Sequence, residues 1–404
     1  MLCATLPASA QCQYEVIPIY APLCNGQHSP AYALSINELG QVCGYYTVCG
    51  IGANRPFIWK PLPGDPDHGT FTTIPLPPGF TSGQANDIND NGVVVGYGQK
   101  TGLGFRAFIY KDGVSTELPP FHGPDEQGWS NANAINNAGT VVGYRSIGSR
   151  ESPINPKTAF LWNEKNGFTD LYPLLTGPNS EALDIDEDGT IVGWTGIAFQ
   201  STDQAFVFRN GSVSYLPTLP GFAGATPRTT SGSFVGGSAN FLVGIQYYPR
   251  AVVWRNGFIH DLGILPGHDM STALAINDRG QTVGVSSSLQ GDATLVLWLG
   301  GETFDINNLL LDPKNFGLGA IYDINDQGIM CGSGIEFFTP SHIAVVLRPV
   351  KHSDGDVNGD CAVNIDDLTS VILGWGKSHD PADLDQDGVV DAPDMLLVIE
   401  NWSV

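Results

Sequence analysis

Short runs of alternating apolar and polar residues, separated by turn residues, recur along most of the chain. One phrase reads Ala-x-x-Ile-Asn, two turn residues, Gly, a β-branched pair and Gly, and with small variations it starts at residues 33, 85, 132, 182, 273 and 321. A decayed copy occupies residues 229–237. The closing glycines lie about 43 to 52 residues apart, at Gly44, Gly96, Gly143, Gly193, Gly236, Gly284 and Gly332. Such a regular period is typical of a repeat architecture.

Two further alternating segments follow each phrase, which predicts four short antiparallel strands in every repeat. The first segment ends on an aromatic residue, as in TAFLW at 158–162, and the second ends in Leu-Pro or a close variant, as in VSYLP at 213–217. Alternation with β-branched and aromatic residues is a strand signal. Asx-Gly pairs, as at Asp112-Gly113 and Asn210-Gly211, are typical of hairpin turns between such strands.

Four-stranded units of this length are the blades of β-propellers, which protect their sheet edges by radial arrangement. We therefore expect a mainly β fold, a seven-bladed β-propeller over residues 11–350. The last repeat lacks a fourth strand after residues 342–348, whereas YEVIPI at 14–19 is similar to the fourth-strand segment FTTIPL at 71–76. We expect this N-terminal strand to complete the last blade and close the ring.

The third-strand segments also resemble a bacterial extracellular repeat family named for a His-Ala-Phe triplet, the HAF repeats. Ala107-Phe108, Ala159-Phe160 and Ala205-Phe206 keep the last two residues of that triplet, whereas Arg, Thr or Gln replaces the His. The resemblance spans roughly residues 30–348. It implies a fold and no particular activity, because propellers support many unrelated functions.

Composition and charge narrow the class of protein and its location. With 50 Gly, 28 Pro and 15% charged residues, the chain is rich in turns, and helices should be scarce. A net charge of −23 disfavours nucleic acid and anionic membranes as partners. No apolar run is long enough for a transmembrane segment. Residues 1–10 end in Ala-Ser-Ala, the form of a signal-peptide cleavage site, so we expect a signal remnant there and a secreted or cell-surface protein.

Cysteine usage agrees with an oxidising compartment, because removal of Cys3 with the signal leaves an even number of cysteines. Cys43 and Cys331 hold the same position in the first and last repeats, just before the closing glycine. We expect a disulfide between them across the ring closure.

Residues 351–404 carry two acidic loops with the ligand spacing of calcium sites. The first places oxygen ligands at loop positions 1, 3, 5, 9 and 12 with a backbone carbonyl at 7, and the second repeats this 27 residues later. We expect two calcium ions, each loop leading into a helix, and folding coupled to calcium binding. The expected ligands are Asp356, Asn358, Asp360, Ala362, Asn364 and Asp367, then Asp383, Asp385, Asp387, Val389, Asp391 and Asp394.

The Asp at position 12 and the tandem spacing resemble a type I dockerin more than a calmodulin-like EF-hand. This resemblance implies a small α-helical module that tethers the chain to a cohesin-like protein or cell-surface scaffold. It also implies that loop positions 10 and 11, Ile365-Asp366 and Ala392-Pro393, contact that partner.

The function classes that remain are a non-catalytic binding or scaffold propeller tethered by the C-terminal module, a carbohydrate-active hydrolase, and a structural cell-surface protein. No nucleophile elbow, zinc motif or phosphate loop is present. Asp87, Asp184, Asp323 and Asp305 fall at or near equivalent strand positions, where a propeller could gather carboxylates at its axis. Residues 184–189 copy half of an EF-hand loop and predict a turn instead. We favour the binding propeller, assign no catalytic residue, and leave carbohydrate as a possible ligand.

Overall fold

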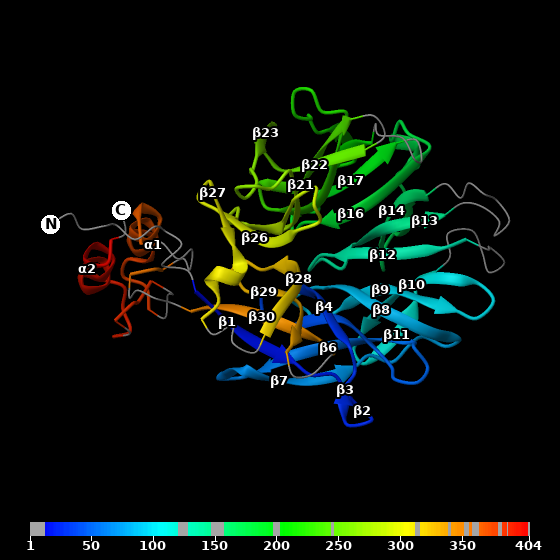
Figure 1. The fold of residues 1–404 in the computed structure, drawn as a ribbon, viewed down its shortest axis with the longest axis horizontal. Helices are drawn as coiled ribbons and strands as arrows, with labels where there is room; N and C mark the ends of the chain where they lie inside the picture. Colours follow the sequence, from blue (N-terminus) through cyan, green and yellow to red (C-terminus); the bar gives the residue numbers. More distant parts are fainter. Residues whose placement is uncertain are drawn as a thin grey trace.

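The chain forms seven four-stranded antiparallel sheets arranged as a propeller, followed by two helices (Figure 1). The computed structural model describes residues 13–119, 128–146, 157–196, 203–243, 246–311, 316–337, 341–350, 355–357, 363–378, 382–385 and 387–402. The first strands of neighbouring blades contact one another all the way round, from β4 to β28 and back to β4, so they surround the axis. The predicted seven-bladed, mainly β fold is confirmed.

The blades are numbered here in chain order, each beginning with the strand next to the axis. Blade 1 is β4 (Ala31–Ile36), β5 (Val42–Thr47), β6 (Asn54–Leu62) and β7 (Asp65–Thr73); blade 2 is β8 (Phe80–Ile88), β9 (Val94–Lys100), β10 (Gly104–Lys111) and β11 (Val114–Glu117); blade 3 is β12 (Ser130–Ile135), β13 (Val141–Ser146), β14 (Lys157–Asn163) and β15 (Gly167–Asp170). Blade 4 is β16 (Asn179–Ile185), β17 (Ile191–Gly196), β18 (Gln204–Arg209) and β19 (Ser212–Tyr215); blade 5 is β20 (Gly224–Ser231), β21 (Phe234–Val243), β22 (Gln246–Arg255) and β23 (Phe258–Asp261). Blade 6 is β24 (Met270–Ile276), β25 (Thr282–Ser287), β26 (Ala293–Leu299) and β27 (Glu302–Asp305); blade 7 is β28 (Phe316–Ile324), β29 (Met330–Glu336), β30 (His342–Val350) and β1 (Gln13–Ile19).

The N-terminal strand closes the ring as predicted. β1 pairs antiparallel with β30 along its whole length, from Gln13 opposite Val350 to Ile19 opposite Ala344. Tyr14 and Ile19, at 1% exposure each, anchor this strand in the cores on either side of blade 7. The two ends of the propeller are therefore held together by main-chain hydrogen bonds.

The repeated Ala-x-x-Ile-Asn phrase is explained by one β-bulge on the first strand of the blade. In blade 3 the register with β13 shifts between Ala132 and Ala134, and Ala132 lies opposite the closing Gly143. A Cβ on Gly143 would lie 2.0 Å from the Asn131 carbonyl oxygen, so only glycine fits. The same close approach occurs at the equivalent closing glycines of blades 1, 2, 4, 6 and 7.

The predicted two-residue hairpin turns have the expected backbone conformation. Asp112 and Gly113 have φ of 51° and 83°, and Asn210 and Gly211 have 50° and 77°, as the predicted two-residue hairpins require.

The predicted Cys43–Cys331 disulfide is wrong, because both are buried free thiols. Cys24 instead pairs with Cys49, next to the small hairpin of β2 (Leu23–Cys24) and β3 (Gln27–His28).

Two α-helices, α1 (Ile365–Gly374) and α2 (Ala392–Glu400), form a small unit with its own core. That core is built from equivalent positions of the two halves, Val363 with Val390 and Val371 with Val398, which confirms the internal repeat. Two short 3-10 helices, η2 (Tyr172–Leu174) and η3 (Ile306–Leu309), follow β15 and β27. Among the described residues, no helix has the length and apolar character that a membrane span needs.

Candidate functional site

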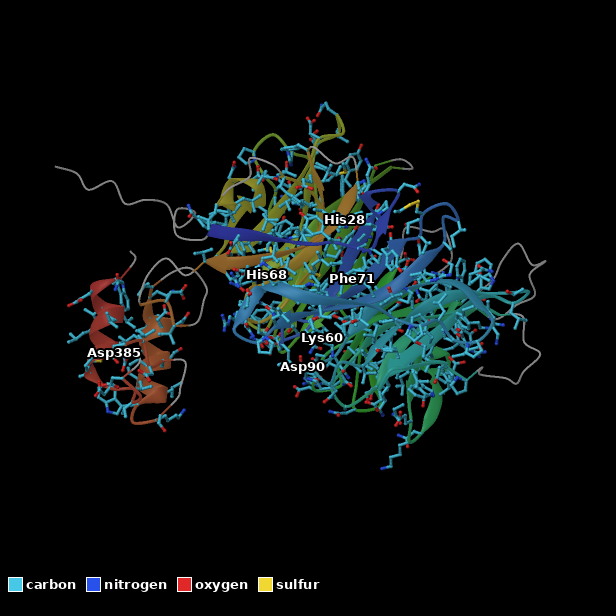
Figure 2. The ribbon with its side chains drawn as sticks, turned by 90° about the horizontal axis from the view of Figure 1, so that it is seen from below. His28, Lys60, His68, Phe71, Asp90 and Asp385 are labelled. Atoms are coloured by element: carbon cyan, nitrogen blue, oxygen red, sulfur yellow. A yellow bond between two sulfur atoms is a disulfide. The ribbon has the colours of Figure 1, made fainter. Side chains whose placement is uncertain are left out.

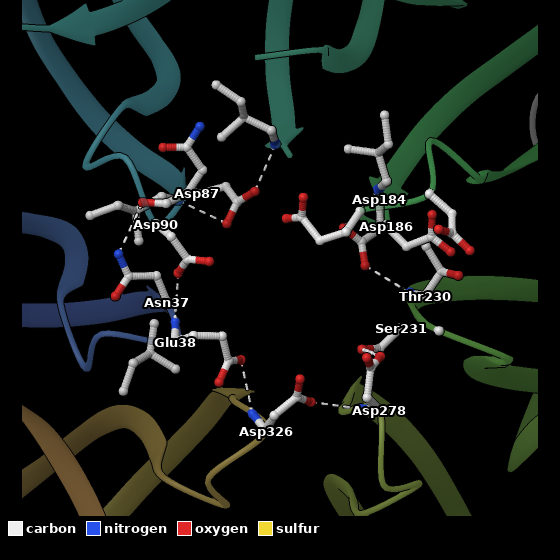
Figure 3. Close-up of a pocket in the computed structure, with 18 residues that line it drawn as sticks. Asn37, Glu38, Asp87, Asp90, Asp184, Asp186, Thr230, Ser231, Asp278 and Asp326 are labelled. Carbon is white, nitrogen blue, oxygen red and sulfur yellow. Dashed lines mark hydrogen bonds between the residues drawn. The ribbon is translucent and has the colours of Figure 1, made fainter. Parts of the chain in front are cut away.

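An acidic pocket of about 280 Å³ lies at one end of the propeller axis (Figure 3). Its walls are the turns that follow the first strands of the blades, together with the isoleucines of the repeated phrase. No Lys or Arg is among its lining residues. Its carboxylates are Glu38, Asp87, Asp90, Asp184, Asp186, Glu187, Asp188, Asp278 and Asp326.

The asparagine of the repeated phrase links neighbouring blades around this pocket. Its Nδ2 donates to the backbone carbonyl of the equivalent residue in the next blade, as from Asn89 to Asn136 at 2.9 Å. Its Oδ1 accepts the amide four residues further on, as from Thr140 to Asn136 at 3.0 Å. We call this set the asparagine ring, and its members are Asn37, Asn89, Asn136, Asn277 and Asn325.

The residue after each asparagine forms a second ring, the outer ring, in which the side chain reaches back to the preceding blade. Its side chain accepts the backbone amide of the preceding blade, as Asp90 does from Glu38 at 2.9 Å and Glu38 does from Asp326 at 2.9 Å (Figure 3). The remaining described members are Asn137, Glu187 and Asp326, with Asp278 accepting from the Ser231 hydroxyl instead. The acidic character of the pocket therefore follows from carboxylates that clamp the blades together.

Among the described residues, both rings lack their regular bonds on both sides of blade 5, where only the Ser231 hydroxyl, donating to Asp278, links the phrases of blades 5 and 6. Asp186 takes the asparagine position in blade 4, so it has no amide group to donate, and blade 5 offers Ser231 and Gly232 in place of the Asn and the acid. Between blades 4 and 5 the only described link between the phrases is the Asp184 carboxylate, which accepts from the Thr230 amide at 2.7 Å. The decayed repeat was visible in the sequence, but its consequence for the rings was not predicted.

Asp186 retains an unsatisfied polar atom as a result. The residue is 6% exposed, its Oδ1 accepts from the Thr190 amide at 2.8 Å, and its buried Oδ2 makes no hydrogen bond. Burial raises the pKa of Asp186, the Thr190 amide opposes this, and the Asp188 charge adds to it. The Thr190 hydroxyl beside this carboxyl lowers the pKa of Asp186.

Three of the predicted axial carboxylates do converge. Burial, together with their mutual repulsion, raises the pKa of Asp184 to about 8 and that of Asp323 to about 7, and burial also raises the pKa of Asp87. Each accepts backbone amides on both oxygens, as Asp87 does from Ile88 at 2.8 Å and from Ile135 at 2.7 Å. Such groups act as blade clamps, and this geometry does not favour the hydrolase alternative.

The fourth predicted carboxylate, Asp305, does not join them. It ends β27, where its Oδ1 caps η3 by accepting the Asn307 amide at 2.9 Å.

The second acidic loop of the C-terminal unit brings three of its six predicted ligands together. Asp383, Asp385 and Asp387 each offer a carboxylate oxygen within 4.8 Å of the others. Buried Oδ1 atoms of Asp383 and Asp391 have no hydrogen-bond partner. Gly388 has a φ of 101°, which provides the sharp turn expected at loop position 6. The donor set is all oxygen and spatially compact, so it fits a hard divalent cation.

Backbone amides hold the aspartate side chain at position 12 of each acidic loop. Asp394 is fully buried and accepts from Leu384 at 2.6 Å and from Asp391 at 2.7 Å, and Asp367 accepts from Val357 at 2.8 Å. Burial opposes ionisation of Asp394, but these amides hold its pKa below the usual range. In the first loop Asp356 and Asn364 are also described, and Asn358, Asp360 and Ala362 lie outside the described residues. Val389, at position 7, is 43% exposed.

The predicted partner contacts, Ile365, Asp366, Ala392 and Pro393, are exposed at the starts of α1 and α2. Large apolar side chains on and directly after these helices are also open to solvent, including Leu373 at 71% and Trp375 at 50% exposure. Figure 2 shows Asp385 on the two-helix unit and Asp90 on the propeller, so the two acidic sites lie on different parts of the chain.

Comparison with known proteins supports the fold and leaves the function open. A family profile described as a protein of unknown function, DUF3466, matches residues 68–195. No curated protein matches. The β-propeller domain of the trilobed protease from Pyrococcus furiosus superposes with a TM-score of 0.53 at 11% identity, covering 80% of this chain and 95% of that one. Acylaminoacyl peptidase from Pyrococcus horikoshii gives a TM-score of 0.49 at 10% identity, covering 80% of this chain and 52% of that one.

These findings correct two expectations. The identification of the repeats as HAF repeats and of the C-terminal unit as a type I dockerin is wrong, because the family profile that matches is DUF3466, over residues 68–195. The structural similarity also has a limit. The Pyrococcus furiosus domain is described as having an open velcro topology, whereas here β1 pairs with β30 and closes the ring.

Proposed function

We propose that this protein is a secreted, non-catalytic β-propeller binding protein whose C-terminal two-helix unit is ordered by calcium. The observation that carries the calcium proposal is the convergence of Asp383, Asp385 and Asp387 with buried, unpartnered carboxylate oxygens beside them. Repulsion among these acids opposes folding of the loop, and a bound divalent cation removes it. The equivalent first loop, with Asp356 and Asp367, would hold the second ion.

Secretion is supported by the Cys24–Cys49 disulfide, since such bonds persist in oxidising compartments. The non-catalytic part is supported by the axial carboxylates, which are occupied by backbone donors. Exposed apolar side chains on α1 and α2 support a role for this unit in attachment to another protein, with Ile365, Asp366, Ala392 and Pro393 at its edge.

Calcium titration of the full chain by calorimetry tests the proposal, with Asp385→Asn and Asp366→Asn as a matched pair. Both changes remove one charge from the same unit, but only Asp385 contributes an oxygen to the cluster. We expect two calcium ions per chain for the wild type and for Asp366→Asn, and loss of one site in Asp385→Asn. Equal calcium binding by both variants, or none by the wild type, would refute the proposal.

A further inference from the structure

A groove of about 670 Å³ lies between blades 2 and 3, next to the axial pocket. Blade 2 contributes the turn after β8 and the turn between β10 and β11, and blade 3 contributes the two equivalent turns. We call it the interblade groove. Its volume is in the range of small-molecule sites, and its lining combines apolar side chains, such as Ile109 and Trp162, with several asparagines.

The charges that line the interblade groove cancel, unlike those of the axial pocket. The lining holds two lysines and two acids, Lys111, Lys165, Asp112 and Glu164. Lys111 pairs with Glu164 at 3.0 Å and so joins the two blades on the exposed side. Since neither sign of charge prevails, in a chain of net charge −23, the groove suits an uncharged ligand.

Trp162 offers an unpaired hydrogen-bond donor in this groove. Its side chain is 8% exposed, and its Nε1 makes no hydrogen bond with the described residues. In blade 6 the Nε1 of Trp298 is also unpaired but is enclosed by protein, whereas the Nε1 of Trp162 keeps accessible surface. In blade 5 the Nε1 of the equivalent Trp254 donates to the Pro217 carbonyl at 2.7 Å. The Trp162 donor is therefore held in a largely buried ring and is available to an oxygen atom of a ligand.

Asparagine side chains around the groove also keep unused hydrogen-bonding groups. Asn163 Oδ1 accepts from the Asn166 backbone amide at 2.8 Å, which leaves Asn163 Nδ2 and the Asn166 side chain without partners among the described residues. Asn91 Nδ2 donates to the Asn137 carbonyl at 3.0 Å, which leaves Asn91 Oδ1 as an acceptor. The groove thus presents neutral donors and acceptors together. A sugar hydroxyl matches such a lining, because it also donates and accepts without carrying charge.

On the basis of the binding function proposed above, we propose that the interblade groove binds a short neutral oligosaccharide. One sugar oxygen accepts from Trp162 Nε1, and neighbouring hydroxyl groups bond to the side chains of Asn163 and Asn166. The C–H groups of the sugar lie against the half-buried side chains of Val93 and Ile109.

The test is a microarray of neutral and acidic oligosaccharides probed with the full, calcium-saturated chain, followed by calorimetry with the neutral oligosaccharide that is best retained. Trp162→Phe keeps an aromatic ring and removes the N–H donor. We expect it to bind about three- to tenfold more weakly than the wild type, as loss of one hydrogen bond implies. Trp254→Phe makes the same chemical change in blade 5 and should bind as the wild type does. Asn166→Ala, at an exposed residue, should fold normally and also weaken binding.

Four results would overturn the proposal. They are no retention of any neutral oligosaccharide, equal retention of the acidic ones, equal weakening by Trp254→Phe, and wild-type affinity in a folded Trp162→Phe. If Trp162→Phe does not fold, wild-type affinity in Asn166→Ala has the same meaning. Calcium titration of the same samples separates this site from the calcium loops. A chain that binds two calcium ions and no oligosaccharide rejects the groove alone, whereas oligosaccharide binding without calcium binding rejects the calcium proposal alone.

Discussion

Replacing Asn136 by Asp should reproduce in blade 3 the defect that occurs naturally in blade 4. Asn136 is 2% exposed, and its Nδ2 donates to the Asp186 carbonyl at 3.1 Å while its Oδ1 accepts from Thr140. An aspartate at residue 136 still accepts from the Thr140 amide, but it cannot donate to the Asp186 carbonyl. Its second carboxylate oxygen then faces that carbonyl oxygen with no hydrogen between them.

The magnitude follows from these two changes. Loss of a buried hydrogen bond with one partner left unsatisfied costs about 1–3 kcal/mol, and a buried ionised group costs more. We expect the free energy of unfolding to fall by about 3 kcal/mol at pH 8. At pH 5 a protonated carboxyl can donate to the carbonyl again, so the loss should shrink to about 1 kcal/mol.

Urea unfolding followed by tryptophan fluorescence measures both values. Asn210→Asp is the control, because it makes the same chemical change in an exposed hairpin turn and should leave the unfolding midpoint unchanged. If Asn136→Asp unfolds at the wild-type urea concentration at pH 8, the asparagine ring does not stabilise the propeller and the reasoning fails.

Three further predictions test other parts of the structure. Gly143→Ala places a Cβ 2.0 Å from the Asn131 carbonyl, so soluble yield should collapse or stability should fall by at least about 3 kcal/mol, and near-wild-type urea stability would contradict the bulge geometry. Asp184 and Asp323 have pKa values of about 8 and 7 in the fold and near 3.8 when unfolded, so the stability that they contribute is complete below pH 4 and is lost as pH rises through 7 and 8. The free energy of unfolding from urea titrations should therefore decrease between about pH 5 and pH 7 by about 1.4 kcal/mol per pH unit for each of the two groups and level off above about pH 8, and a flat profile between about pH 5 and pH 7 would refute this. Deletion of residues 1–19 removes β1 and leaves β30 as an open edge, so size-exclusion chromatography should show association or aggregation, and a stable monomer would argue against closure by β1.

The blade pattern could be predicted because its causes are local. Alternation identifies the strands, Asx-Gly pairs identify the hairpins, and each closing glycine marks a point where backbone approaches backbone. Ring closure was also predictable, since the last repeat lacked one strand and residues 14–19 supplied its pattern. These features depend on residues within one repeat or on a count of strands.

The interblade rings could not be predicted, because their bonds join residues that are distant in the sequence. The amide of Asn325 donates to the Asn37 carbonyl across the ring closure, and nothing in either phrase identifies that partner. Cysteine pairing failed for a similar reason. Cys43 and Cys331 hold equivalent positions, but equivalence between blades does not bring their sulfur atoms into bonding geometry, whereas Cys24 meets Cys49 near a hairpin outside the repeat pattern.

The acidic loops show that a local sequence motif can predict ligand positions but not the family of a whole domain. In the structure Asp383, Asp385 and Asp387 lie around one point, as ligand spacing predicts, because loop geometry depends only on neighbouring residues, and whether they bind calcium stays a prediction. The dockerin assignment required more, namely similarity over a whole domain, and the family comparison does not provide it. A calcium hypothesis is therefore supported by the coordinates of the loop, and the partner of the two-helix unit must be sought without that family as a guide.

Blades with the intact asparagine phrase and blade 4, where Asp186 replaces the asparagine, contribute differently to the stability of the propeller. Where the phrase is intact, the asparagine side chain and the side chain that follows it bond to the neighbouring blades, so those residues contribute to stability. In blade 4, Asp186 replaces the asparagine and donates nothing to blade 5, so the described link between these two phrases is the Asp184 carboxylate on the Thr230 amide. Replacing Asp186 by Asn should therefore supply the missing interblade donor and raise the free energy of unfolding, and an unchanged urea midpoint for this variant would show that the amide finds no acceptor in blade 5.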